Sequence, residues 1–319
     1  MKTELRSLAA ELEQRLEGLV ENDRPLARLT TYRLGGPAAL YVEPRDAVDL
    51  EALGATLREA GPDRPPVLVL GRGSNLVVSD RGWPGLVLRL GPGFTWVEAS
   101  AEVEHGLSAG GAKPLPLVAN WAARRSLSGM EWAVGVPGSV GGAVRMNAGA
   151  HGGDMARCVL SVGLFDLERG TLERRDVERL DFSYRHSSLE SHEVVVDATL
   201  QLTPADPAEV RKDMEAYRRH RAETQPGALQ NAGSTFKNPP GDSAGRLVEA
   251  AGLKGFRVGG ASVSEIHANF FMASEEALAQ DIFDLVAQVR ERVRDTTGID
   301  LQPEVRFAGP FDERVETVS

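Results

Sequence analysis

The sequence predicts a two-domain protein that mixes helices with short strands, and three observations support this. The chain has 319 residues, which is more than one typical domain. Strand-like apolar runs recur in its first two thirds, at residues 39–43, 66–70, 76–80, 86–90, 159–166, 171–176 and 193–202. Beyond the linker-like segment TPADP at 203–207, the pattern changes to helices separated by loops. We therefore expect a domain boundary near Pro204.

Apolar spacing and capping residues predict the helices. Leu5, Leu8, Leu12, Leu16 and Leu19 lie at helical spacing, which gives an amphipathic helix over residues 4–19. Aspartate or serine precedes several of the others, as is usual at helix starts. The further helices are expected at residues 46–60, 116–126, 208–220, 243–251 and 274–296, followed by a strand at 301–307.

Composition and charge exclude several classes of protein. The sequence has no apolar run long enough to span a membrane and no secretory signal pattern. Cys158 is the single cysteine, and no Cys/His cluster has zinc spacing, so we expect neither a disulfide nor a metal. A net charge of −10 argues against nucleic-acid binding. The sequence thus predicts a cytoplasmic protein, and a small anionic substrate remains possible where cations gather locally.

Two glycine-rich stretches are candidate ligand loops. The turn GRGSN at 71–75 lies between two strand-like runs, so it differs from the dinucleotide fingerprint, which needs a helix after the glycines. Its backbone amides can form an anion-binding nest, but a plain hairpin turn is the alternative. The stretch at 135–153 is denser in glycine, and each glycine costs conformational entropy on folding. Close approach of the backbone to a flat or phosphorylated ligand explains it better.

The segment NAGSTFKNP at 231–239 combines chemically useful residues between two predicted helices. Gly233 allows close backbone approach, Ser234 can transfer a proton, and Lys237 can neutralise an anion. The basic run of Arg218, Arg219 and Arg221 precedes it. By itself, the segment is equally compatible with a turn that caps the next helix.

These stretches resemble the UDP-N-acetylenolpyruvoylglucosamine reductase family, flavoenzymes of peptidoglycan synthesis and cell-wall biogenesis. Residues 30–37, 70–80, 135–152 and 231–264 carry the resemblance, in the order of the family. It implies an α+β fold, with a two-subdomain FAD-binding domain of the vanillyl-alcohol oxidase type and a smaller α+β substrate-binding domain. The implied limits are a helical extension at 1–24, the FAD-binding domain at 25–203, the substrate-binding domain at 204–311 and a tail at 312–319.

The resemblance also implies an activity and its residues. The expected reaction is NADPH-dependent reduction of UDP-N-acetylglucosamine enolpyruvate to UDP-N-acetylmuramate through noncovalent FAD, by a monomer. The matching catalytic positions are Arg185 in a Tyr-Arg pair, Ser234, and Glu304 in Pro-Glu-Val. The implied substrate-binding residues are Tyr184, Tyr217, Arg221, Lys237 and Asn238. The implied cofactor-binding residues are Tyr32, Gly35, Gly71, Gly73, Ser74, Asn75, Gly135, Pro137, Gly138, Ser139, Gly141, Gly142, Asn147, Gly149 and Val196.

Plainer explanations stay open for single residues and for the protein. By themselves, Arg185 is compatible with an ordinary surface arginine and Glu304 with a salt-bridge partner at a strand end. Thr224 stands where many family members have a lysine, so contacts to the diphosphate can be distributed differently. A sugar or alcohol oxidase of the same fold is one rival, although GRGSN offers no histidine or cysteine for covalent flavin. A non-catalytic binding protein is the other, although all three catalytic positions are kept.

Overall fold

The computed structural model describes residues 2–227 and 230–312, so the expected tail lies outside it from residue 313. The chain forms two compact units whose segments alternate along the sequence. Of the described residues, the first unit contains 2–23, 39–72 and 85–221, and the second contains 24–38, 73–84, 222–227 and 230–312. The domain limits implied by the sequence, which end at residues 24, 203 and 311, do not alternate in this way, and they stay a prediction.

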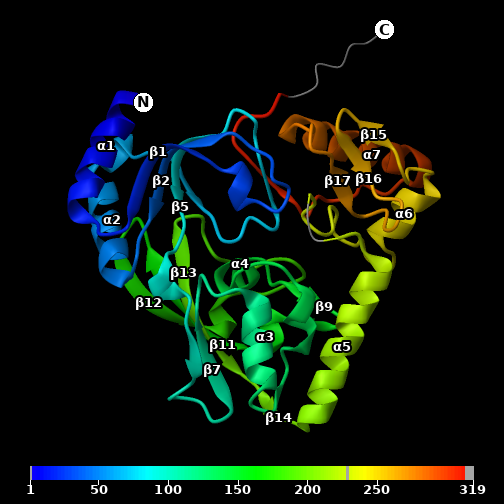
Figure 1. Cartoon of the computed structure of the whole chain (residues 1–319), viewed down its shortest axis with the longest axis horizontal. Coiled ribbons are helices and arrows are strands. Elements are labelled where there is room, and N and C mark those ends of the chain that lie inside the picture. The colour runs from blue at the N-terminus through cyan, green and yellow to red at the C-terminus, as the bar shows by residue number, and fades with distance from the viewer. Residues whose placement is uncertain (1, 228–229, 313–319) are drawn as a thin grey trace. The chain divides into compact units, whose positions relative to one another are not determined.

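The N-terminal helix packs into the first unit. Helix α1 (Lys2–Arg15) lies beside α2 (Ala47–Glu59) (Figure 1). The leucines of the two helices share one buried cluster. The helix was expected to continue to Leu19, but Leu19 instead begins strand β1 (Leu19–Pro25). The chain turns there because Asp49 accepts a hydrogen bond from the backbone N–H of Glu17 at 2.9 Å. A Cβ at Gly18 would lie 2.3 Å from the carbonyl oxygen of Glu43, so only glycine fits this approach.

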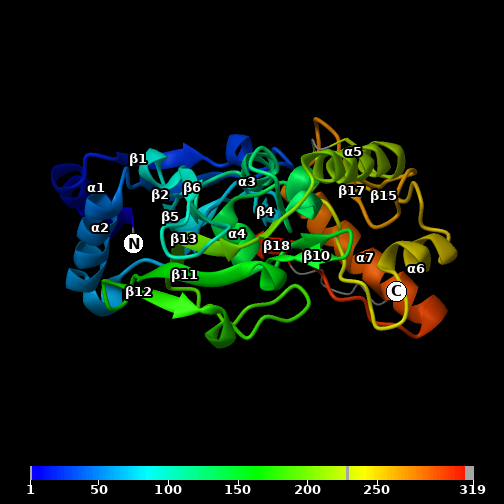
Figure 2. The same cartoon turned by 90° about the horizontal axis from the view of Figure 1, so that it is seen from below.

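A four-stranded sheet lies next to these two helices (Figure 2). Its strand order is β1-β2-β5-β3, with β2 at Pro37–Glu43, β5 at Trp83–Leu88 and β3 at Val67–Val69. Asp46 caps α2, as predicted, because its side chain accepts from the N–H groups of Val48 and Asp49. The cap fixes where the chain leaves β2 and enters the helix.

A five-stranded antiparallel sheet is the second large sheet of the first unit. Its order is β12-β11-β13-β7-β6, at Thr171–Asp176, Val159–Asp166, Glu193–Gln201, Gly106–Gly110 and Val97–Ala99. Helices α3 (Leu115–Ala123) and α4 (Val140–Arg145) also belong to this unit, and α4 packs on β13. Two short pairs complete it, β8 (Leu127–Ser128) with β14 (Thr203–Pro204) and β9 (Gly149–Ala150) with β10 (Gly153–Asp154). Helix α5 (Pro207–Thr224) follows β14.

The second unit is built around helix α7 (Ala279–Thr297). Its predicted apolar face is buried, including Ile282, Leu285 and Val289. The helix was expected to begin after Ser274, but residues 274–278 form a turn in which the N–H of Ser274 bonds the carbonyl of Gly260. Asp281 fixes the true start, because its carboxylate accepts from the N–H groups of Leu278 and Gly260.

Short strands and one short helix surround α7. Strands β15 (Arg257–Val258), β16 (Ala261–Val263) and β17 (Phe271–Ala273) form an antiparallel sheet, and α6 (Ala244–Ala250) is capped by Ser243 as predicted. Strand β4 (Leu76–Val78) pairs in parallel with β18 (Arg306–Ala308). Because β3 and β4 belong to different sheets, the turn at 71–75 is not a hairpin turn.

The strand expected at 301–307 is mostly irregular. Only Arg306–Ala308 is a strand, so Glu304 lies just before it. The preceding backbone pairs with the loop at 235–237 instead, since the N–H groups of Glu304 and Lys237 donate to the carbonyls of Thr235 and Gln302.

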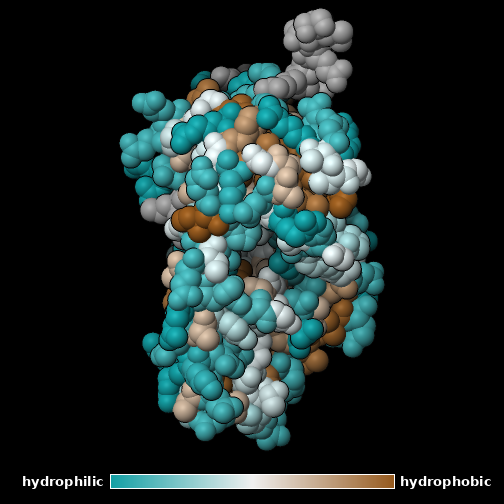
Figure 3. Space-filling model, turned by 90° about the vertical axis from the view of Figure 1, so that its right-hand side faces the viewer, coloured by the Kyte–Doolittle hydropathy of each residue, from teal (hydrophilic) through white to brown (hydrophobic). Residues whose placement is uncertain are grey.

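The surface shown in Figure 3 is mostly polar. On the face in Figure 3, hydrophilic residues cover most of the surface and apolar ones form small separate groups. None of the helices within residues 2–227 and 230–312 combines the length and apolar character needed to cross a bilayer.

Candidate active site

The first unit contains a cavity of about 330 Å³ that brings together distant parts of the sequence. Four of the predicted cofactor-binding residues line it: Gly71, Ser139, Gly141 and Gly142. Sequence reasoning did not find its charged lining, which consists of Glu43, Arg72, Arg89, Arg145 and Glu193.

The glycines and Ser139 let the cavity walls approach one another. Ser139 caps α4 by accepting a hydrogen bond from the N–H of Gly142 at 3.3 Å. A Cβ at Gly71 would lie 2.6 Å from the hydroxyl oxygen of Ser139, and one at Gly141 would lie 3.2 Å from the carbonyl oxygen of Val195. Larger residues at these positions would displace the wall, so the sequence needs glycine here for packing as well as for access.

The charged lining makes the cavity suited to a phosphorylated ligand. Arg72 and Arg89 supply guanidinium groups, which match phosphate geometry. The lining also contains the negatively charged Glu43. Its carboxylate accepts a hydrogen bond from the hydroxyl of Tyr41. Burial, and then this bond to Glu43, raises the pKa of Tyr41 to about 12, so its hydroxyl stays protonated.

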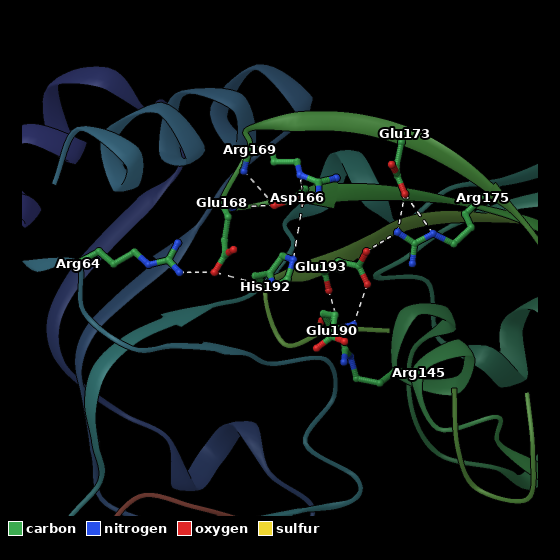
Figure 4. A network of polar contacts seen from close by, with 10 residues as sticks. All are labelled: Arg64, Arg145, Asp166, Glu168, Arg169, Glu173, Arg175, Glu190, His192 and Glu193. Atoms are coloured by element: carbon green, nitrogen blue, oxygen red, sulfur yellow. Dashed lines mark hydrogen bonds and ion pairs between the residues drawn. The ribbon is translucent and has the colours of Figure 1, made fainter. Parts of the chain in front are cut away.

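An ion-pair network holds one wall of this cavity (Figure 4). Arg175 contacts both Glu193 and Glu173, and the Glu193 side chain is only 8% exposed. Arg145 donates to the backbone carbonyls of Glu190 and Glu193 at 2.8 and 2.7 Å. Burial would by itself raise the pKa of Glu193, but the hydrogen bonds from Arg175 and from the N–H of Glu190 outweigh it and lower that pKa.

We expect Glu193→Ala to lower the free energy of unfolding by roughly 3 kcal/mol, because it leaves Arg175, whose side chain is only 14% exposed, with Glu173 alone. Urea-induced unfolding measures this. Glu168→Ala is the matched control in the same network, since its pair with Arg64 is exposed and is expected to contribute about 0–1 kcal/mol. The difference in unfolding free energy between the two variants should shrink as the pH falls below the ordinary pKa of a glutamate. The pKa of Glu193 is lowered in the folded protein, so its carboxylate stabilises the fold only while it is ionised. Equal losses for the two variants would contradict the buried-pair account.

Several other predicted cofactor residues of the first unit serve its internal structure. Asn147 is buried, and its amide bridges the carbonyl of Ser183 and the N–H of Ala156 at 3.0 and 2.9 Å. The carbonyls of Val196 and Gly138 accept from the N–H groups of Gly111 and Leu115. Pro137 adjoins Gly138, and Gly149 lies in β9. These contacts give Asn147, Val196 and Gly138 structural roles within the first unit.

The predicted cofactor residues of the second unit are also tied to their surroundings. Tyr32 is 1% exposed and donates to the carbonyl of Phe271 at 3.0 Å, and burial raises its pKa. Gly35 packs against Val78, because a Cβ there would lie 2.7 Å from the Cβ of Val78. Gly73 accepts from the N–H of Thr31 at 3.1 Å and precedes Ser74. These residues hold the segments at 24–38 and 73–84 together.

Arg185 and Tyr184 occupy the tip of a tight turn in the first unit. The N–H and carbonyl groups of Ser183 and His186 pair with each other, and Arg185 has a φ of 56°, a left-handed conformation that is costly for a non-glycine residue. The Arg185 guanidinium donates to the carbonyl of Gly149 at 2.8 Å and lies 4.9 Å from the ring centre of the exposed Tyr184. The structure thus joins a predicted catalytic residue to the glycine-rich stretch.

Ser234 and Glu304 come together in the second unit. Glu304 donates its N–H to the carbonyl of Thr235, next to Ser234, at 2.8 Å. The amide of Asn75 donates to the Glu304 carbonyl at 3.0 Å, so the backbone of Glu304 is held from both sides. Ser234 is half-buried, and its hydroxyl makes no hydrogen bond to any residue of the described ranges.

The substrate-binding residues expected in this loop follow Ser234 closely. The carbonyl oxygen of the Asn238 side chain accepts from the N–H of Ala244 at 3.0 Å, which links the loop to α6. Lys237 is fixed through its backbone N–H, which donates to Gln302 at 2.9 Å. Gly233 has a φ of 75°, and a Cβ there would meet no atom within 4 Å, so backbone conformation explains this glycine better than crowding.

Tyr217 and Arg221 lie one turn apart on α5 in the first unit. The ring of Tyr217 stacks on His151, and the side chain of Arg221 packs against Gly135. His151 was not among the residues predicted from the sequence, although it stands two residues after the predicted Gly149. Within residues 2–227 and 230–312, no group of three or more His, Cys, Asp or Glu side chains is placed to hold a metal.

Comparison with known proteins agrees with this arrangement. Residues 38–175 match the model of an FAD binding domain, and residues 225–308 match that of the UDP-N-acetylenolpyruvoylglucosamine reductase C-terminal domain. A protein of that name from Synechococcus sp. (strain JA-3-3Ab) is 43% identical over 303 residues, covering 94% of each chain. One from Synechococcus elongatus is 46% identical over 295 residues, covering 91% of this chain and 94% of the other.

The structure is also similar to a solved one. It matches the crystal structure of UDP-N-acetylenolpyruvylglucosamine reductase from Thermus caldophilus with a TM-score of 0.77 and 35% sequence identity. The match covers 92% of this chain and 100% of the Thermus caldophilus chain. Fold and matches together define an FAD-binding oxidoreductase with an α+β architecture. The chain belongs to the UDP-N-acetylenolpyruvoylglucosamine reductase family.

Proposed function

We propose that the protein reduces UDP-N-acetylglucosamine enolpyruvate to UDP-N-acetylmuramate with NADPH, through FAD, in the synthesis of peptidoglycan precursors. The observation that carries the proposal is the pairing of the Ser234 loop with the backbone of Glu304 in the second unit. This backbone contact joins Glu304 to Thr235, the residue after Ser234, and it supports a shared role of Ser234 and Glu304 in proton delivery to a carbanion.

The residues of the first unit fit FAD. The cavity combines bare backbone at Gly71, Gly141 and Gly142 with Arg72 and Arg89, whose guanidinium groups can face a diphosphate. When bound, FAD supplies the hydride that adds to the methylene carbon of the enolpyruvyl group. The protein's own residues then manage the charge and the proton that this addition requires.

Arg185 is proposed to hold the substrate carboxylate. Hydride addition leaves negative charge on the carbon beside that carboxylate, and a planar guanidinium stabilises the resulting enolate-like form. Ser234 donates the proton to this carbon, and Glu304 positions the reacting group. Tyr184, Tyr217, Arg221, Lys237 and Asn238 are proposed to bind the rest of the substrate.

FAD is proposed to be noncovalent, because the segment at 71–75 contains no histidine or cysteine. The thiol of Cys158 is buried, and burial raises its pKa to about 12, so it is a poor nucleophile. Acid precipitation of the purified protein should therefore release all yellow colour into the supernatant. Colour that stays in the pellet would show a covalent bond.

The activity itself is tested by anaerobic absorbance spectroscopy. NADPH should bleach the flavin, and the enolpyruvyl substrate should then restore its colour. Bleaching without restoration would point to a different acceptor and reject the proposed reaction.

We also propose that the protein is a cytoplasmic monomer. Sedimentation velocity of the holoenzyme checks its oligomeric state directly.

A further inference from the structure

A buried asparagine of the second unit binds the backbone of the loop that carries Ser234. Asn269 lies in the turn between β16 and β17 and is only 3% exposed. Its Oδ1 atom accepts a hydrogen bond from the N–H of Phe236 at 2.9 Å, and its Nδ2 atom donates to the carbonyl of Phe236 at 2.8 Å. Its backbone carbonyl accepts from the N–H of Thr235 at 2.8 Å. We call these three hydrogen bonds the Asn269 clamp.

The clamp replaces regular secondary structure in this loop. Residues 231–238, all of which the structure describes, form no helix or strand. They pair with neighbouring segments through isolated bridges, Ser234 with Phe270 and Phe236 with Pro303. The side-chain amide of Asn269 offers one acceptor and one donor side by side, as the peptide groups of a neighbouring strand would.

The clamp and Glu304 hold the same peptide group. The carbonyl of Thr235 accepts from the N–H of Glu304 at 2.8 Å, and the N–H of Phe236 in that peptide donates to Asn269. The peptide that follows Ser234 by one residue is therefore fixed at both of its polar ends. Loss of the Asn269 side chain would leave the N–H and the carbonyl of Phe236 buried without these partners, which favours a shift of the loop.

Asn269 is itself held by the turn on which it lies. Its N–H donates to the Nδ1 atom of His267 at 3.2 Å, and the hydroxyl of Ser264 accepts from the N–H of Ile266 at 3.2 Å. Burial lowers the pKa of His267, so its Nδ1 atom stays an acceptor at neutral pH. The amide therefore projects from a turn with its own hydrogen bonds, which gives the loop a fixed reference.

We propose that Asn269 is a positioning residue, which sets the place of the Ser234 hydroxyl for proton delivery. Its side chain is buried and pairs with Phe236, so it acts through the loop backbone rather than on the substrate. The clamped residues lie between Ser234 and Lys237, so one displacement moves both. The chemical role rests on the proposed function, whereas the clamp rests on the hydrogen bonds alone.

The test is anaerobic stopped-flow absorbance of the holoenzyme with Asn269→Ala and Asn269→Asp. Reduction of the flavin by NADPH should stay close to the wild-type rate. The limiting rate of reoxidation at saturating enolpyruvyl substrate should fall by about 10²-fold, the usual effect of misplacing a reacting group by about 1 Å. The substrate concentration for half-saturation should change little, because the substrate does not contact Asn269.

The pH dependence of Asn269→Asp tests the hydrogen bonds directly. An ionised carboxylate keeps the acceptor for the N–H of Phe236 but lacks the donor for its carbonyl, and the protonated carboxyl regains that donor. Burial should raise the pKa of the new carboxyl, so reoxidation relative to wild type should recover as the pH falls from about 8 to about 6. Asn269→Ala has no such group and should not recover. It keeps His267 and the charged Lys254 and Glu249 that act on it, so it also controls for their titration.

Asp281→Ala is the matched control for stability. It also removes a side chain that binds two backbone groups of the second unit, the N–H groups of Leu278 and Gly260. It should lower the melting temperature and leave reoxidation near the wild-type rate. If both Asn269 variants lowered the melting temperature in the same way but reoxidised at the wild-type limiting rate, Asn269 would be structural and the proposal would be overturned. A raised half-saturation concentration alone would make it a binding residue and would also overturn it.

Hydrogen exchange separates failure of the clamp from failure of the proposed function. If the enolpyruvyl substrate did not reoxidise the wild-type flavin, the proposed function would fail. Mass spectrometry would then still test the clamp, because the amides of residues 233–238 should exchange faster in Asn269→Ala and Asn269→Asp than in Asp281→Ala. Equal exchange in these three variants would show that Asn269 does not hold the loop.

Discussion

Ser234→Ala will leave reduction of the bound flavin by NADPH nearly unchanged and will slow flavin reoxidation by the enolpyruvyl substrate by about 10²–10⁴-fold. The first half-reaction needs no proton from this hydroxyl, whereas the second needs one for the carbon beside the carboxylate. Alanine should not disturb the loop. The backbone is held by the bridge between Ser234 and Phe270 and by the N–H of Thr235, which donates to Asn269 at 2.8 Å.

Anaerobic stopped-flow absorbance measures each half-reaction separately. Ser234→Cys should recover part of the second rate, because a thiol can also donate a proton. Ser262→Ala on β16 of the same unit is the control and should affect neither rate. If Ser234→Ala slowed both half-reactions equally, or neither, the serine would have a structural role.

Local sequence patterns predicted the regular elements well, but they failed where tertiary contacts determine whether an element forms or where it ends. The apolar spacing of α7 and the cap of α2 at Asp46 needed no knowledge of the fold. The helix α4 could not be predicted in the same way, because its sequence VGGAVR contains two glycines that disfavour helix. Packing on β13 stabilises it instead. The end of α1 likewise depends on Asp49, which is distant in sequence from Glu17.

The candidate site was predictable only where its residues follow one another in the chain. The loop at 231–239 and the glycine-rich stretches stood out as short motifs, and family resemblance gave them roles. The charged lining of the cavity comes from strands and loops as far apart as Glu43 and Glu193, and no spacing in the sequence links them. His151 was missed for the same reason, because its partner ring at Tyr217 becomes adjacent only after folding.

Arg185→Lys should slow reoxidation of the flavin by the substrate by roughly 10²–10³-fold, the usual effect of removing a donor that stabilises developing negative charge. Lysine keeps the positive charge but loses the planar fork, so it cannot bind a carboxylate through two parallel hydrogen bonds. It also loses the guanidinium contact to the carbonyl of Gly149, which sets the direction of the Arg185 side chain. The left-handed backbone at this position costs lysine and arginine alike, so the substitution leaves that strain unchanged.

The two half-reactions again separate a catalytic role from a structural one. Reduction by NADPH should stay close to the wild-type rate, and saturating substrate should not restore reoxidation, because the lost interaction is strongest in the enolate-like state. Arg179→Lys is the matched control, since Arg179 is exposed and precedes the same turn in the short helix Val177–Arg179. A variant at Arg185 that only raised the KM for the substrate, with an unchanged limiting rate, would show that the guanidinium binds the ground state and contributes nothing further to the reduction.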